Sequence, residues 1–483
     1  FSDFMINPEY WRTQKIIYLK KNSGVQKLLG LETNEKYASF NDFHEAQFSY
    51  KLAEEASEAR RKPAGKRNVL DKELLKTDER VSIMYMAFAG ELFKIFPAPK
   101  AQSGEWINWQ DSLARIPLAE NPNARSITYQ AIMWKYLSDL HAATKSGDYS
   151  DADKMLADIS AIQRAATKEE VIPSEQRVAL EIEYNDAEIF STLRNKYGIL
   201  SFCLLLFALL DVIIRKKDSK IYLFFVDFPL WLLIGFLGVY FLQHTYGMGL
   251  RWYLTGHAPW SNGYEALVTI AWGGLLSGFV FARYSKITLA ATSLLAFFVL
   301  MVAGFSQYDP QLTNLQPVLK SYWLVIHVAV ITISYGFFGL GFILSLINLI
   351  ISVFRNERNQ KRLTLLIREL THINEMTLII GIALATVGTF LGGVWANESW
   401  GRYWGWDQKE TWALAIVMCY GFVLHQRLIP GLRGIIAFNN GSLWGFGSVI
   451  MTFVGVNYYL SKGLHSYAAG DTPAFPSWIW GMI

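Results

Sequence analysis

The run YWLVIHVAVITISYGFFGLGFILSLINLIISVF, at positions 322–354, contains no charged residue. As an α-helix it would be roughly 50 Å long, whereas the apolar core of a bilayer is about 30 Å thick. The run therefore predicts a membrane-spanning helix that is longer than the bilayer requires. Arg355 follows it and fixes the inner end, so the excess length lies at the outer end, which carries His327.

Seven other apolar runs accompany this stretch, and a bilayer-spanning helix needs about 20 apolar residues. The eight predicted spans lie near 197–214, 221–242, 263–282, 287–305, 322–353, 374–396, 411–427 and 441–460. Before them the chain is charged and mixed, with helical spacing of apolar residues in 68–93 and 151–170. The predicted fold class is an all-α polytopic membrane protein with about eight transmembrane helices (196–483), preceded by a mostly helical soluble domain (1–195).

Lys and Arg gather in every second connection between the spans, and connections of this kind face the cytoplasm. The basic set comprises Arg215, Lys216, Lys217, Lys220, Arg283, Lys286, Arg355, Arg358, Lys361, Arg362, Arg368, Arg427 and Arg433. The opposite set holds only Arg251, Lys320, Arg402, Lys409 and Lys462. An even number of spans then places both chain ends, and with them residues 1–195, outside the cytoplasm.

Composition excludes several classes of function. A net charge of +4 over 483 residues is too small to argue for nucleic-acid binding. Cys203 and Cys419 lie in apolar runs and neither belongs to a C-x-x-C pair, which argues against a thiol–disulfide oxidoreductase and a c-type cytochrome. The chain begins with Phe1 and without a signal peptide, so we expect it to be cut from a longer protein.

The stretch WGRYWGWDQKETW, at positions 400–412, combines four tryptophans and a tyrosine with charged residues. It joins the outer ends of the sixth and seventh predicted spans. His327 lies near the outer end of the fifth span, and His465 lies just beyond the outer end of the eighth. Two imidazoles and one aromatic loop are therefore predicted to share one membrane depth.

Haem is a candidate ligand for this combination. Indole faces can pack against the macrocycle, and Arg402 and Lys409 can donate to the anionic propionates. An imidazole on either side would complete six-coordinate iron. The alternative is an interfacial aromatic anchor, but an anchor does not explain Asp407 and Glu410 among the tryptophans.

The remaining histidines carry weaker signals. His425 lies in the cytoplasmic half of the bilayer, where a histidine at a helix C-terminus is favoured by the helix dipole. His244 and His257 flank a glycine-containing outer segment, and local hydrogen bonding explains them as well as ligation does. His372 lies in the basic cytoplasmic connection and is expected to be solvated.

Four segments resemble a known family. WGRYWGWDQKETWAL resembles the tryptophan-rich WWD signature of membrane haem-handling proteins. YWLVIHVAVITISYG and VNYYLSKGLHSY resemble the flanking segments with paired external histidines, and RWYLTGHAPWSNGYEALVTIAW is similar to the CcsA branch. Over roughly 244–466 the chain resembles the system II cytochrome c synthases, CcsA or the fused CcsBA. Residues 1–195 resemble the family only weakly, and the chain looks like the C-terminal part of a fused CcsBA.

The resemblance implies roles for particular residues. His327 and His465 would be the axial ligands of an external haem iron. His425 would ligate a second, inner haem iron, with its partner ligand outside this chain. The loop 395–412 would be the haem-binding shelf, with Trp395, Trp400, Arg402, Tyr403, Trp404, Trp406, Asp407 and Trp412.

The resemblance also implies an activity. Such proteins export haem b across the bacterial inner membrane and join its vinyl groups to the CxxCH thiols of apocytochrome c. The N-terminal domain and the WWD loop would be periplasmic, and a CcsB-like membrane half would be required. Most of the contribution of the protein would be positioning, and the sequence assigns no catalytic acid or base.

Two other functions remain open. The chain could be a haem transporter or chaperone that hands haem on without attaching it, or a polytopic scaffold without haem. An absorption spectrum of the purified protein separates the scaffold from the other two. Co-expression with an apocytochrome c separates the synthase from the transporter.

The charge asymmetry of the connections predicts the orientation. A reporter fused within 355–372 should stay cytoplasmic, and one within 397–409 or 1–195 should be exported. Paired alkaline phosphatase and green fluorescent protein fusions measure this. An exported 355–372 reporter would reverse the map and move the Trp-rich loop to the wrong side.

Overall fold

The computed structural model describes residues 3–4, 7–20, 24–45, 49–62, 67–98, 106–109, 129–166, 172–214, 219–305, 308–313, 315, 320–458 and 460. The chain forms two compact units, residues 1–175 and residues 176–483.

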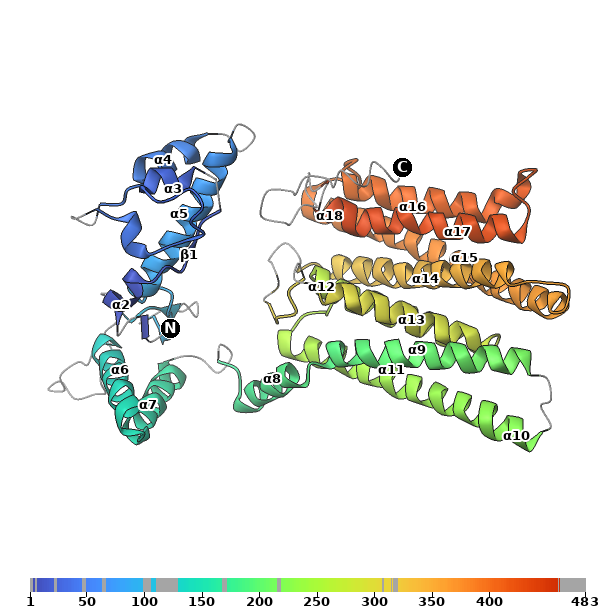
Figure 1. The fold of residues 1–483 in the computed structure, drawn as a ribbon, viewed down its shortest axis with the longest axis horizontal. Helices are drawn as coiled ribbons and strands as arrows, with labels where there is room; N and C mark the ends of the chain where they lie inside the picture. The colour runs from blue at the N-terminus through green and yellow to red at the C-terminus, as the bar shows by residue number, and fades with distance from the viewer. Residues whose placement is uncertain are drawn as a thin grey trace. The chain divides into compact units, whose positions relative to one another are not determined.

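The first unit is built from helices and two small antiparallel sheets (Figure 1). β1 (Ile17–Tyr18) pairs with β2 (Tyr37–Ala38), and β3 (Phe96–Pro97) pairs with β4 (Trp106–Ile107). The helices are α2 (Pro8–Thr13), α3 (Val25–Leu29), η1 (Phe40–Phe43), α4 (Ala53–Arg61), α5 (Val69–Phe88), α6 (Tyr129–Ser146) and α7 (Ser150–Ala166). The spacing in 68–93 and 151–170 thus corresponds to α5 and α7.

The second unit is a helical bundle. Its elements are α8 (Glu175–Ala187), α9 (Ile189–Ile213), α10 (Lys220–Tyr222), η3 (Leu223–Asp227), α11 (Phe228–Thr255), α12 (Gly263–Phe281), α13 (Lys286–Ala303), α14 (Tyr322–Val353), α15 (Gln360–Trp400), α16 (Gln408–His425), η5 (Gln426–Leu428), α17 (Ile435–Ile450), η6 (Met451–Gly455) and α18 (Val456–Tyr458). In Figure 1 the long helices run side by side, from α11 at one edge to α16 and α17 at the other.

The division between the two units falls at the start of α8, and residue 195 lies inside α9. α8 packs on the other helices of the second unit. Tyr184 of α8 is buried in the same core as α9, and Arg177 donates to the carbonyl of Leu254 at the end of α11.

Six helices within the described residues are long and apolar enough to cross a membrane, and they coincide with the first six predicted spans. The other two predicted spans, 411–427 and 441–460, correspond to α16 and α17. The first turn of α16 carries Lys409 and Glu410, and α17 has only 16 residues before it continues as the π-helix η6. The structure therefore supports a multi-pass membrane unit with six clear spans.

The sixth span is longer than predicted. α15 begins at Gln360, so that Arg362, Arg368 and His372 lie on the helix rather than in a connection. The side chain of His372 is exposed, and its Nδ1 lies 3.9 Å from Oε2 of Glu375. The connection between the fifth and sixth spans, which the Lys and Arg pattern assigns to the cytoplasm, is therefore only the short segment before α15.

α14 is the central helix of the bundle and packs against α12, α13, α15 and α17. Its closest approach is to α12, at Gly336. A Cβ atom at this position would lie 2.5 Å from the backbone nitrogen of Gly274 and 2.7 Å from the backbone carbon of Gly273. Small residues allow helices in membranes to approach this closely, which increases van der Waals contact where no hydrophobic effect drives association.

Polar side chains join the C-terminal part of α14 to the N-terminal parts of α15 and α17. Asn348 donates to Thr371 at 3.1 Å and to Asn439 at 3.2 Å, and Asn374 donates to Ser345 at 2.8 Å. All five side chains are buried, so that the hydrogen bonds replace water as their partners. This amide cluster fixes the relative register of the three helices.

Candidate functional site

A cavity of about 640 Å³ lies in the membrane unit. Its wall is formed by the start of α14, the C-terminal end of α15, the loop before α16, η6, Leu315, and two connections at 257–263 and 308–313. Pockets for small molecules and cofactors measure about 300–1,000 Å³, so that this cavity is large enough for such a ligand.

His327 lines the cavity from the second turn of α14. Its Nδ1 lies 2.6 Å from the carbonyl oxygen of Gly388 on α15. Because a carbonyl only accepts, Nδ1 carries the proton, and the lone pair of the neutral ring lies on Nε2. A backbone carbonyl orients metal-binding histidines in this way.

Gly392 on α15 makes room for this imidazole. A Cβ at position 392 would lie 2.6 Å from Cε1 of His327, closer than real Cβ contacts come. The ring is therefore held from one side by the Gly388 carbonyl and from another by the backbone at Gly392. The position of His327 is fixed by the tertiary contact of α14 with α15.

Three aromatic residues of the predicted shelf line the same cavity: Trp395, Tyr403 and Trp404. Lys409 and Glu410 line it as well. Within the described part of the chain, no hydrogen-bond acceptor meets the buried indole N–H of Trp404. An orphaned buried donor on a cavity wall is a group that a ligand with an acceptor would satisfy.

Five predicted shelf residues do not line the cavity among the described residues: Trp400, Arg402, Trp406, Asp407 and Trp412. Trp400 packs edge-on against Trp395, with ring centroids 4.7 Å apart, and so supports a residue that lines the cavity. Trp406 contacts Trp404 in the same way at 5.8 Å, but its side chain is 71% exposed. The guanidinium of Arg402 lies over Gly405, where a Cβ would approach it to within 2.3 Å.

Trp406 also has an unusual backbone, with φ of +56°. A bulky residue in the left-handed region costs of order 1–3 kcal/mol and persists only where its surroundings impose it. The residue lies directly before Asp407, the N-cap of α16.

Asp407 and Glu410 have a structural role that the sequence argument missed. Asp407 is the N-cap of α16, and its Oδ1 accepts from the backbone N–H of Glu410 at 2.9 Å. Glu410 accepts in turn from the N–H groups of Asp407 at 3.3 Å and Gly405 at 2.7 Å. This capping box explains both acids without a ligand, so that their presence is no argument for haem.

Of the other two predicted iron ligands, the structure describes only His425. His465 lies outside the described residues. His425 is the last residue of α16; its side chain is exposed, and its Nδ1 lies 2.8 Å from the carbonyl oxygen of Gly421 in the same helix. The cavity therefore contains His327 but not His425.

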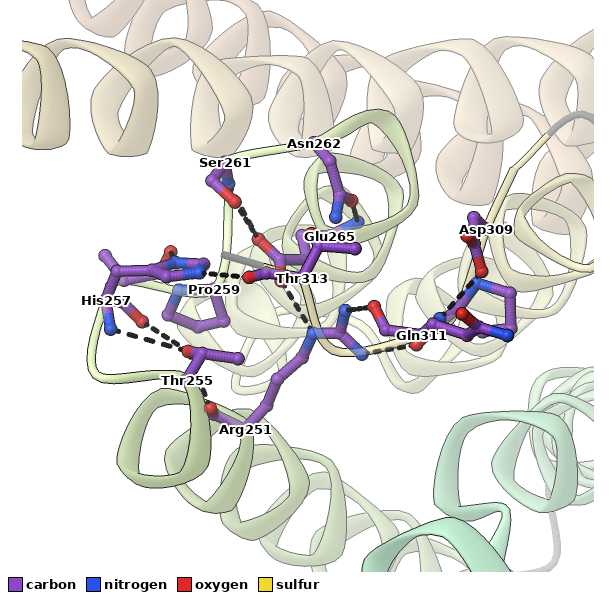
Figure 2. A network of polar contacts seen from close by, with 12 residues as sticks. Arg251, Thr255, His257, Pro259, Ser261, Asn262, Glu265, Asp309, Gln311 and Thr313 are labelled. Carbon is purple, nitrogen blue, oxygen red and sulfur yellow. Dashed lines mark hydrogen bonds and ion pairs between the residues drawn. The ribbon is translucent and has the colours of Figure 1, made fainter. Parts of the chain in front are cut away.

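Sequence reasoning gave little weight to the wall opposite the Trp-rich loop. It contains His257, Trp260 and Tyr308, and Tyr335 of α14 lines the cavity too. His257 lies within 3.0 Å of the Thr313 carbonyl oxygen through Nε2, which ties together the two connections that form this wall (Figure 2). Only the place of His257 at the outer membrane depth could have suggested this role.

The family model described as cytochrome c assembly protein matches residues 260–465. Among curated proteins, protein NrfI of Wolinella succinogenes is 39% identical over 467 residues, which are 96% of this chain and 49% of that protein. The chain thus spans about half the length of NrfI.

Shorter relatives are covered more fully. The cytochrome c biogenesis protein CcsA of Chlorella vulgaris is 33% identical over 295 residues, 51% of this chain and 92% of that protein. The protein of the same name from Prochlorococcus marinus is 33% identical over 305 residues, 56% of this chain and 93% of that protein.

The capping box predicts how Asp407 variants behave. Asp407→Ala should lower the free energy of unfolding by about 0.5–2 kcal/mol, because the N-cap bond is lost, whereas Asp407→Asn should retain most of it. Thermal unfolding of the purified protein in detergent measures both variants. An equal loss with Asn would point instead to a role for the carboxylate charge.

Proposed function

The chain belongs to the CcsA family of cytochrome c biogenesis proteins, and from this premise we propose that its outer cavity holds haem for attachment to apocytochrome c. The haem would arrive from the cytoplasmic side of the bilayer. The protein would act as a synthase that requires further membrane helices of a CcsB-like partner or segment. The following observations support this proposal.

The observation that carries the proposal is the His327 imidazole in an aromatic-lined cavity. Its hydrogen bond to Gly388 selects the tautomer with the lone pair on Nε2, the form that ligates iron. Trp395, Tyr403 and Trp404 offer ring faces to a flat apolar macrocycle. The orphaned Trp404 N–H, together with Lys409, would donate to carboxylates at its edge.

His465 is proposed as the second external ligand. The chain that leads toward it passes the cavity, because Thr452, Phe453 and Asn457 all line the wall. The proposal rests on the resemblance of VNYYLSKGLHSY to the segment with the second external histidine.

The proposed chemistry is thioether formation between the haem vinyl groups and the two CxxCH thiols. Each thiol adds across a vinyl group, so that its sulfur bonds to carbon and its proton is transferred to the neighbouring carbon. The chain contributes position: His327 would fix the iron, and the aromatic wall would fix the plane of the ring. The substrate histidine of CxxCH would then displace one of the two protein imidazoles.

His425 is proposed as a ligand of an inner haem during export. Its Nδ1 is engaged by Gly421, so the ring would bind iron through Nε2, as His327 would. The exposed position of His425 at the inner end of α16 leaves room for another protein surface to supply the opposite ligand. We propose that this ligand comes from helices outside the chain.

Variants of the external histidines test the first site. His327→Gly or His465→Gly should lower haem retention at least roughly 10- to 100-fold, because even loss of an outer-shell partner costs this much in metal affinity. Added imidazole should restore the low-spin spectrum, since the cavity remains. His141→Gly, an exposed histidine of the first unit, is the control. Unchanged spectra and full cytochrome assembly in both variants would refute the assignment.

His425→Gly tests the inner site. Haem content and cytochrome assembly should fall while the protein remains inserted and folded, because export is interrupted before the outer cavity. Imidazole in the medium should restore part of both. Normal haem content in this variant would leave His425 as a helix-end histidine without a role in transport.

A further inference from the structure

A buried ion pair contacts the two connections that form one wall of the outer cavity. Nε of Arg251, near the end of α11, lies 2.7 Å from Oε1 of Glu265 in the first turn of α12. Both side chains are 1% exposed or less. Figure 2 shows the guanidinium between α12 and the connection that contains Gln311.

Arg251 uses its remaining donors on other parts of the chain. It donates to the carbonyl oxygens of Pro310 and Gln311, both at 2.8 Å, and to the hydroxyl of Tyr184 at 3.2 Å. One guanidinium therefore joins α8, α11, α12 and the connection 308–313. The planar fork of arginine can serve several acceptors at once, whereas a lysine ammonium cannot reproduce this geometry.

The second carboxylate oxygen of Glu265 binds the other connection, 257–263. Oε2 accepts from the backbone N–H and from the hydroxyl of Ser261, both at 2.8 Å. Asn262 caps α12 by accepting from the backbone N–H of Glu265 at 2.9 Å. The carboxylate thus holds the turn that enters α12 against the start of the helix.

The two segments held in this way, 257–263 and 308–313, both line the cavity. Ser261, Asn262 and Gly263 belong to the first, and Tyr308 and Thr313 to the second. The bond from His257 to Thr313 joins them at the cavity itself, but the ion pair joins them from behind. Neither Arg251 nor Glu265 lines the cavity.

We propose that Arg251 and Glu265 are positioning residues of the haem site, which hold the wall 257–263 and 308–313 at the distance from His327 that the macrocycle requires. This inference rests on the proposed function. A buried ion pair is weak evidence for stability, because hydrophobic residues of similar volume often replace one without loss. Its presence beside the cavity is explained by its contacts with α8, α11, α12 and the connection 308–313, whose relative positions it fixes.

Arg251→Lys is the sharpest test. Lysine keeps the charge pair with Glu265 but cannot donate to Pro310 and Gln311 together, so that the wall 308–313 is released while charge balance is kept. Haem should then be lost to excess apomyoglobin about 10-fold faster than from the wild type. The bis-imidazole spectrum of the haem still bound should be unchanged, because His327 is untouched.

Asp227→Asn is the matched control. Asp227 lies 3.5 Å from Lys286 in an ion pair of the same membrane unit, outside the cavity wall. This variant should release haem at the wild-type rate. Equal acceleration in Asp227→Asn and Arg251→Lys would show a general effect of ion pairs on stability and would overturn the proposal.

The double variant Arg251→Met/Glu265→Met removes both charges. It should insert and unfold like the wild type, yet release haem as fast as Arg251→Lys, because the backbone groups of both connections lose their partner. Wild-type haem retention in the double variant, or in Arg251→Lys, would overturn the positioning role. Absence of haem from the wild type would refute the proposed function instead, so that the two failures are distinguishable.

Discussion

The membrane unit depends on the packing of α14, because lipid leaves a chain few ways to satisfy its polar groups. Backbone N–H and C=O groups must bond within helices, and polar side chains must find partners across helices. α14 meets both demands with a charge-free sequence and contacts to four neighbours. At Gly336 it lies so close to α12 that any side chain would displace backbone.

The polar residues of α14 differ between its two ends. Near the C-terminal end, Ser345 and Asn348 are buried and bonded to α15 and α17. Near the N-terminal end, His327 is bonded to α15 and also lines a cavity. The same helix thus provides a closed polar contact on one side of the bilayer and an open one on the other.

Much of the fold follows from the sequence, since an uninterrupted apolar run of span length has one stable structure in lipid. Six of the eight predicted spans correspond to helices that are long and apolar enough to cross a membrane. The count beyond six was not settled by the pattern, because α16 begins with Lys409 and Glu410 and α17 is short. The contact of α8 with α11 does not follow from the pattern, because it joins Arg177 to Leu254, which are distant in sequence.

Two parts of the predicted site line one cavity, and one of the observations used to predict it has a structural explanation. Depth alone brought His327 and the Trp-rich loop together, and the cavity contains both. Asp407 and Glu410 were taken as signs of a ligand, although the D-x-x-E spacing before an apolar helix is the pattern of a capping box. The place of Tyr308 could not be predicted, because the bonds from Arg251 to Pro310 and Gln311 that hold its segment join residues far apart in the chain.

The two histidines proposed for haem differ in how their rings are fixed. Each engages a backbone carbonyl through Nδ1, which puts the lone pair of the neutral ring on Nε2. The carbonyl for His327 belongs to another helix, so that its ring is held by tertiary structure and needs no ligand to stay in place. The carbonyl for His425 belongs to its own helix, and the ring is exposed. A histidine ring that is already held in place favours retention of haem. A histidine ring that needs a second ligand from another protein surface favours transfer of haem. The proposed route, on which haem passes His425 and is held at His327, would use this difference.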